Sequence, residues 1–199
     1  MIFRYDERAK KHLCEQDAKL GSFIKTFGDI EREMQPDLFE ALTNSIISQQ
    51  ISGKAAMAIY SRLKAAAGEL TPAVIAALPE PEIRQCGISQ RKTAYIKTAA
   101  DAILTGTLNP ARLQGLDNEE VIGVLTQLPG IGRWSAEMIL IFSLGREDVL
   151  SYGDFGIRRG IMKLHSLSEL SKKQFHYYQT LYSPYGSIAS FYLWEIAAL

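Results

Sequence analysis

The sequence predicts an all-α protein, and three observations support this prediction. Apolar residues recur at helical spacing along most of the chain. No segment shows the alternation of apolar and polar residues, bounded by hairpin turn signals, that is typical of a β-strand. The 199 residues are 47% hydrophobic and 22% charged, and they contain no low-complexity tract or long Gly/Ser linker. This length fits one compact domain, or two small lobes that share a core.

The first expected helices lie in the N-terminal third of the chain. Residues 1–35 carry an amphipathic pattern, and we expect a helical segment that covers the core. Helices are then expected over 37–50 and 52–67, and Gly68 is a stop signal for the second of them. A lobe boundary near 35–40, with a chain that later crosses back, is compatible with this pattern.

The middle of the chain continues with helices that have clear start signals. Thr71-Pro72 is typical of the N-cap and first turn of a short helix. A longer helix is expected over about 89–105. A capping-box pattern predicts a helix over 118–127, which a tight turn at 128–132 follows. The remaining helices are expected at about 133–144, 155–164, 169–182 and 187–198.

Composition and charge exclude several classes of protein. No apolar run approaches the roughly 20 residues that span a bilayer, and the N-terminus lacks the pattern of a signal peptide. We therefore expect a cytoplasmic protein. Cys14 and Cys86 are too few for a disulfide framework or a four-cysteine cluster.

The charge distribution is uneven although the net charge is zero. Residues 1–40 hold seven Lys/Arg and nine Asp/Glu, a net of −2, whereas residues 43–100 hold seven against three, a net of +4. This local excess permits an anionic partner, but solvated helix faces explain it equally well.

Residues 128–136, LPGIGRWSA, form the most informative stretch. Gly130 and Gly132 lie between two expected helices, where they permit a tight turn and leave backbone N–H groups uncovered. These N–H groups, together with the positive end of the next helix, are suited to binding a phosphate. A glycine-rich turn without any ligand is the alternative.

Several motifs together resemble one family. LPGIGRWSAEMIL resembles the hairpin of the helix-hairpin-helix DNA glycosylases, with the motif spanning 118–144, and Asp154 lies 20 residues after Trp134, as the catalytic aspartate of that family would. Three further strings match in the expected order: ALTNSIISQQISGKAA (41–56), GISQRKTAYIKTAADAI (87–103) and YGDFGIRRG (152–160). The resemblance is to the 3-methyladenine DNA glycosylase II type, in a compact form without an N-terminal β domain. It covers roughly residues 36–199.

The resemblance implies a fold and a reaction. It implies one two-lobed helical domain over residues 1–199, with the active-site cleft between the lobes. It also implies a monomeric base-excision repair enzyme that flips an alkylated purine (3-methyladenine or 7-methylguanine type) out of double-stranded DNA and hydrolyses its N-glycosidic bond. One alternative is a relative that acts on a neutral deaminated, oxidised or mispaired base. Another is a non-catalytic DNA-binding module.

Asp154 is the candidate catalytic residue. By resemblance, its carboxylate would stabilise an oxocarbenium-like sugar and orient or activate water. From local sequence alone, an aspartate before a helix is an ordinary N-cap. The candidate residues of the base pocket are Trp134, Met138, Phe155 and Trp194. Aromatic faces attract a cationic base, although core packing is the alternative for each ring. Met138 stands where some relatives have a tyrosine, so the resemblance leaves the substrate range open.

The candidate DNA contacts fall in three groups. Gln50, beside Ser52, would by resemblance fill the space that the flipped base leaves, whereas the bare sequence also allows an exposed helix end. Gly130 and Gly132, with Arg133 nearby, would anchor a phosphate. The remaining basic candidates for phosphate contacts are Lys54, Arg91, Lys92 and Arg158. The alternative for each is a solvated helix face that does not touch DNA.

The resemblance also bears on cofactors and on strand cleavage. No cofactor is expected to be required, but the family holds a monovalent cation on hairpin carbonyls, which here correspond to Thr126, Leu128 and Ile131 and would take Na⁺ or K⁺. No cysteine follows Cys86, so an iron–sulfur cluster is not expected. Trp134 occupies the position of the lysine nucleophile in strand-nicking relatives, so we expect an enzyme without lyase activity.

Overall fold

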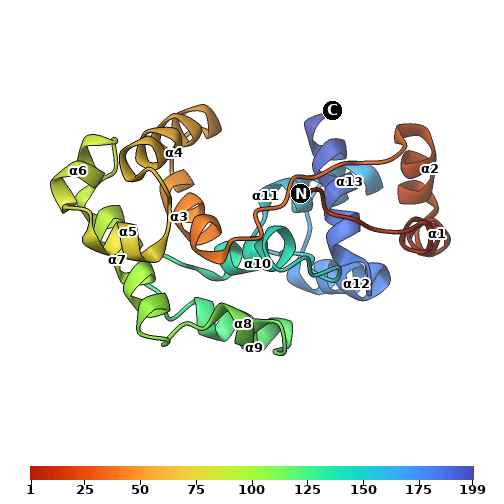
Figure 1. The fold of residues 1–199 in the computed structure, drawn as a ribbon. Coiled ribbons are helices and arrows are strands. Elements are labelled where there is room, and N and C mark those ends of the chain that lie inside the picture. The colour runs from red at the N-terminus through yellow and green to blue at the C-terminus, as the bar shows by residue number, and fades with distance from the viewer. The chain divides into compact units, whose positions relative to one another are not determined.

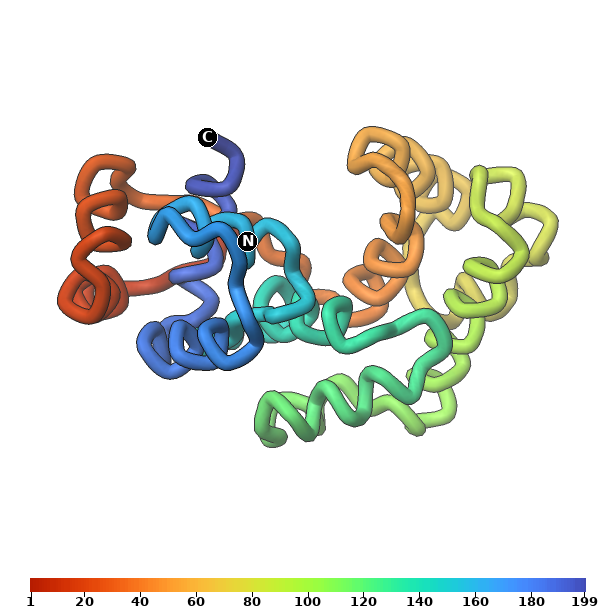
Figure 2. Tube along the Cα trace, turned by 180° about the vertical axis from the view of Figure 1, so that it is seen from behind, coloured from red at the N-terminus to blue at the C-terminus, as the bar shows by residue number.

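The computed structural model describes residues 1–199, and its only β feature is an isolated bridge between Ile2 and Glu33. The prediction of an all-α fold is confirmed. The chain forms two compact units, which Figures 1 and 2 show from opposite sides. The first unit combines residues 1–34 with 140–199, and the second contains 35–139. The chain therefore leaves the first unit, builds the second and returns.

The first unit is built around its C-terminal helix. Its helices are α1 (Glu7–Gln16), α2 (Ala18–Phe27), α11 (Phe155–His165), α12 (Lys172–Tyr182) and α13 (Gly186–Ala198), together with the end of α10 (Arg133–Phe142). Helix α13 is buried along most of its length because its residues, apart from Glu195, are apolar or small. Gly160 of α11 lets the two helices approach, since a Cβ there would lie 2.2 Å from the carbonyl oxygen of Leu193.

The N-terminal segment is part of this unit's core. Phe3 packs edge-on against Phe191 of α13, with ring centroids 5.0 Å apart. Asp17 caps α2 and accepts a hydrogen bond of 2.7 Å from the Tyr182 hydroxyl of α12. Its other contact is with His165 of α11, at 3.0 Å. One buried carboxylate thus joins the linker between α1 and α2 to α11 and α12.

The second unit contains α3 (Leu38–Ser48), α4 (Gly53–Ala67), α5 (Pro72–Ala77), α6 (Glu80–Gln85), α7 (Gln90–Leu104), α8 (Pro110–Leu113), α9 (Asn118–Leu125) and most of α10. The short helices α6 and α8 were not expected, because four to six residues do not display a helical period. Helix α9 ends two residues earlier than expected. In the first unit, α12 begins at Lys172 rather than 169, because Ser171 and Gln174 form a capping box there.

No helix in the structure combines the length and the apolar character that crossing a membrane requires.

Candidate active site and hairpin

Asp154 lies at the start of α11 in the first unit, and only 8% of its surface is exposed. Its Oδ1 accepts a hydrogen bond of 2.8 Å from the backbone N–H of Ile157, which is the N-cap contact that local sequence predicts. The same oxygen accepts a second hydrogen bond, of 3.0 Å, from the indole Nε1–H of Trp194. The carboxylate is therefore an N-cap and also a fixed, largely buried negative charge.

The Trp194 ring is held by other aromatic rings of the same unit. It stacks with Phe142 and Phe191 at centroid distances of 5.9 and 6.0 Å. A Cβ at Gly156 would lie 2.8 Å from Trp194 Cδ1, so only glycine fits beside the indole. The assignment of Trp194 to the base pocket stays a prediction; the structure adds that its ring belongs to an aromatic cluster and that its N–H is directed at Asp154. Phe142 is not among the predicted pocket residues, because no local pattern links it to Trp194.

Phe155 and Arg158 follow Asp154 in the first turn of α11. Phe155 is 69% exposed, although it follows a buried carboxylate directly in the chain. An exposed phenyl ring beside a buried charge is suited to contacting an apolar or aromatic ligand. The Arg158 guanidinium lies 5.2 Å from the centroid of the Tyr152 ring, so it forms a cation–π contact.

Trp134 and Met138 share one face of α10 because four residues separate them. Both belong to the second unit. Trp134 is 45% exposed, and Met138 is half-buried. Trp134 is thus an accessible aromatic face, with a flexible thioether side chain one turn further along the helix.

The hairpin between α9 and α10 has the tight geometry that its glycines predict. Gly130 has φ of +86°, and a Cβ there would lie 2.4 Å from Cδ2 of Tyr95, so both the turn and the packing require glycine. Apart from Gly132 and its chain neighbours, no atom lies within 4 Å of the position that a Cβ of Gly132 would occupy. The backbone near Gly132, directly before the N-terminus of α10, is therefore open to an approaching anion.

Arg133 begins α10, and its guanidinium group is held by two carboxylates. Nη1 donates to Glu119 at 2.8 Å and Nη2 donates to the other Glu119 oxygen, while Nε donates to Glu137 at 3.0 Å. The hydrogen bond to Glu119 is the main reason why the pKa of Arg133 is raised. The sequence predicted that Arg133 lies near a phosphate. The structure adds that its guanidinium charge is paired with Glu119 and Glu137. The spacing of four to Glu137 is a signal that sequence could have used, but the contact with Glu119 depends on closure of the hairpin.

The turn between α3 and α4 carries the candidate residue for insertion into the duplex. Gln50 is exposed and has φ of +59°, in the left-handed region. Only Gly adopts this region freely, and other residues incur a cost of about 1–2 kcal/mol. Ser52 is the N-cap of α4 and accepts a hydrogen bond from the N–H of Ala55. The neighbouring Gln49, which the sequence did not single out, donates a hydrogen bond of 2.6 Å to the Gly130 carbonyl.

The remaining basic candidates of the second unit have different environments. Lys54 and Arg91 are exposed, and the Arg91 guanidinium lies 5.4 Å from the Tyr95 centroid. Lys92 is half-buried, and its ammonium donates hydrogen bonds of 2.8 Å to the carbonyls of Ile47 and Gln49. Burial lowers the pKa of Lys92. Lys92, which was predicted to contact phosphate, thus caps the end of α3 in this structure.

Three hairpin carbonyls are candidates for holding a monovalent cation: those of Thr126, Leu128 and Ile131. The carbonyl of Leu128 accepts a hydrogen bond of 3.1 Å from the N–H of Ile131, which leaves one of its lone pairs for another contact. Backbone carbonyl oxygens can replace the hydration shell of an alkali cation, as they do for K⁺ in channel selectivity filters.

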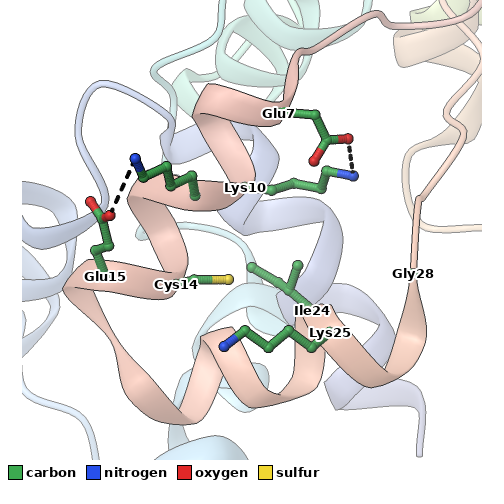
Figure 3. Close-up of a pocket in the computed structure, with 8 residues that line it drawn as sticks. Glu7, Lys10, Cys14, Glu15, Ile24, Lys25 and Gly28 are labelled. Carbon is green, nitrogen blue, oxygen red and sulfur yellow. Dashed lines mark ion pairs between the residues drawn. The ribbon is translucent and has the colours of Figure 1, made fainter.

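A hollow of about 520 Å³ lies beside α1 and α2 in the first unit (Figure 3). It is lined by charged side chains that pair with one another: Lys10 contacts Glu7 at 2.6 Å and Lys11 contacts Glu15 at 3.8 Å. Because no predicted site residue lines it, this hollow is not part of the candidate active site.

Comparison with known proteins extends the similarity over nearly the whole chain. Residues 43–181 match the HhH-GPD superfamily of base excision DNA repair proteins. The DNA-3-methyladenine glycosylase 1 of Schizosaccharomyces pombe is 36% identical over 200 residues, which cover 96% of this chain and 88% of that protein. The similarity therefore reaches into residues 1–35.

Two solved structures have the same fold. A DNA-3-methyladenine glycosidase from Bacillus halodurans matches with a TM-score of 0.88 and 37% identity, over 99% of this chain and 92% of that one. A 3-methyladenine DNA glycosylase from S. pombe in complex with abasic DNA matches with a TM-score of 0.85 and 36% identity, over 96% of this chain and 97% of that one.

Proposed function

The chain belongs to the HhH-GPD superfamily of base excision DNA repair proteins, and from this membership we propose that it removes alkylated purines from double-stranded DNA by hydrolysing their N-glycosidic bonds. Relatives named DNA-3-methyladenine glycosylase, 36% and 32% identical over nearly the whole chain, support this substrate class. The partner is duplex DNA with a damaged base, and the protein acts on it as a monomer.

The observation that carries the proposal is the environment of Asp154. Its carboxylate is 8% exposed, and its Oδ1 is oriented by the N–H groups of Ile157 and Trp194. A fixed, largely buried carboxylate is suited to stabilising a sugar that becomes positively charged as the glycosidic bond breaks. A module that only binds DNA would need no more from Asp154 than the helix cap.

The chemistry divides between the base and the sugar. An alkylated purine such as 3-methyladenine carries a positive charge, so it is a good leaving group and needs no strong general acid. The exposed ring of Trp134 presents an electron-rich face to such a base, and Phe155 is a second accessible ring. The Asp154 carboxylate aligns a water molecule and accepts its proton as the water attacks C1′. The products are the free base and an abasic site.

Base release requires that the nucleotide first leaves the stack. The open backbone at Gly132 and the N-terminus of α10 bind a backbone phosphate. Gln50 then occupies the vacated space in the duplex. A flat amide fills this gap and hydrogen-bonds to the opposite base.

The test is the release of free base, without alkali, from duplex DNA that carries 3-methyladenine and 7-methylguanine. The wild type should release both bases, and Asp154→Asn should bind the DNA yet release neither. Excision by Asp154→Asn at near the wild-type rate would remove Asp154 from the chemistry. Release only from duplexes that carry hypoxanthine or an oxidised base would move the substrate class to neutral lesions.

Two further parts of the proposal have separate tests. We expect no strand nicking, because Trp134 stands where lyases have lysine, so borohydride should trap no covalent adduct with DNA. If Na⁺ or K⁺ binds the carbonyls of Thr126, Leu128 and Ile131 and bridges to phosphate, DNA affinity should fall when tetramethylammonium replaces these ions at equal ionic strength.

A further inference from the structure

Gln49 and Gln50 are adjacent in the sequence but lie in different environments. The Gln49 side chain is half-buried, and its amide donates a hydrogen bond of 2.6 Å to the carbonyl of Gly130. The Gln50 side chain is exposed on a backbone with φ of +59°. One glutamine is therefore engaged within the protein, and the other projects from a strained turn. A strained backbone persists only where the surrounding structure holds it.

The hairpin holds this turn from one side. Gly130 carries the carbonyl that Gln49 contacts, and it lies so close to the Tyr95 ring of α7 that a Cβ would be only 2.4 Å from that ring. The hydrogen bond therefore joins the turn between α3 and α4 directly to the loop that is proposed to bind phosphate.

Lys92 holds the same turn from the other side. Its ammonium reaches from the first turn of α7 to the carbonyls of Ile47 and Gln49, both at 2.8 Å. A cation at the end of a helix satisfies carbonyls that lack intrahelical partners and interacts favourably with the helix dipole. The backbone on the N-terminal side of Gln50 is thereby fixed to α7.

We propose that Gln49 and Lys92 are positioning residues that hold Gln50 in the conformation from which it enters the duplex. Residues 49, 92 and 130 are far apart in the sequence, yet their contacts meet at one turn. The inference rests on the proposed function, because it concerns the residue that replaces the flipped base. It reassigns Lys92 from a phosphate contact to a support of the turn.

The central test is a double-mutant cycle on single-turnover excision from a paired lesion. Gln49→Met keeps the length of the side chain and removes its donor, and Gln50→Ala removes the inserting amide. Each single variant should lower the rate about tenfold, since small misplacements of a positioned group have effects of this order or larger. The double variant should be no slower than Gln50→Ala alone, because Gln49 acts through Gln50. Additive losses would overturn the proposal.

A second substrate separates positioning from general damage to the protein. A lesion opposite an abasic site is already poorly stacked, so its extrusion needs little help. Gln49→Met should excise this lesion at close to the wild-type rate, with an unfolding temperature close to that of the wild type. Equal defects on both substrates would mean that the substitution acts on folding or on the chemical step.

Substitutions of Lys92 test the proposal independently of Gln49. Lys92→Arg keeps donors for the two carbonyls and should retain excision, whereas Lys92→Met should lose it to the same extent as Gln49→Met. The slope of log affinity against log salt should not change in Lys92→Met. If the slope of log affinity against log salt were smaller by about 0.9 in Lys92→Met, Lys92 would be a phosphate contact and the proposal would be wrong. A wild type that excises no alkylated base would refute the proposed function itself. Loss of excision in the variants alone would leave the proposed function intact.

Discussion

The indole N–H of Trp194 donates a hydrogen bond of 3.0 Å to Oδ1 of Asp154, across 40 residues of sequence. The contact joins α13, the buried helix of the first unit, to the start of α11. Trp194 is in turn fixed by Phe142 and Phe191. The orientation of the proposed catalytic carboxylate therefore depends on the aromatic core of its unit.

Trp194→Phe should slow excision without weakening DNA binding. The phenyl ring keeps most of the stacking, but the donor to Asp154 is lost. A hydrogen bond to a charged group contributes about 1.5–3 kcal/mol, so a fall of about tenfold or more in single-turnover rate is expected. Phe142→Leu is the control, because it disturbs the same cluster and leaves the hydrogen bond. A larger rate loss in Phe142→Leu than in Trp194→Phe would contradict this role for the N–H.

Asp154→Asn and Asp154→Ala should differ in stability although both lack activity. The amide oxygen of asparagine still accepts from Ile157 and Trp194 but as a neutral, weaker acceptor, so the free energy of unfolding should fall, though less than in the alanine variant. Alanine removes the N-cap, which costs about 1 kcal/mol, and leaves the Trp194 N–H without this acceptor. Urea unfolding of the three proteins measures the difference. Equal stability of the two variants would show that the cap contributes nothing.

Glu119→Gln should strengthen DNA binding. The substitution removes the carboxylate that pairs with the Nη atoms of Arg133, and it leaves the guanidinium more available to a phosphate. The affinity should rise, and the slope of log affinity against log salt should steepen by about 0.9. Glu69→Gln, which makes the same charge change elsewhere in the second unit, is the control. An identical change in both variants would reduce the effect to net charge.

Tyr182 should make stability depend on pH under alkaline conditions. Burial, and next the hydrogen bond to Asp17, raise the pKa of the Tyr182 phenol. Below the ordinary pKa of about 10 the phenol is neutral in both folded and unfolded chains, so its full contribution is present. Above that pH the unfolded chain loses the proton first, and the free energy of unfolding falls as pH rises.

Tyr182→Phe removes this dependence together with the hydrogen bond. It should destabilise the protein by about 1–3 kcal/mol at pH 8, because Asp17 loses a buried donor. The difference from the wild type should shrink when urea unfolding is repeated above pH 10. A difference that stays constant with pH would show that the phenol titrates alike in both states.

Gly160→Ala should destabilise the first unit. The new Cβ would lie 2.2 Å from the backbone oxygen of Leu193, so α11 and α13 must move apart. Such overpacking costs about 1–3 kcal/mol. Gly123→Ala on α9 is the control: nothing lies within 4 Å of its Cβ position, so helix propensity should stabilise this variant by about 0.5–1 kcal/mol. Thermal unfolding of both variants distinguishes the two effects.

Features that depend on residues within one or two helical turns could be predicted from the amino-acid order. Helical periodicity predicted the long helices, and the capping box at Asp117 and Glu120 predicted the start of α9. The position of Asp154 as an N-cap was equally visible. The glycines of the hairpin predicted its tight turn, because few other residues adopt the φ of +86° that Gly130 has. Resemblance added the roles of Asp154 and Gln50.

The partners of the site residues, in contrast, depend on how the helices pack. Trp194 contacts Asp154, Arg133 contacts Glu119, and the Gln49 amide contacts the Gly130 carbonyl. These pairs are separated by 40, 14 and 81 residues. No local pattern specifies such pairs, because a hydrogen bond between distant residues forms only after helix packing has brought both groups within about 3 Å at a suitable angle.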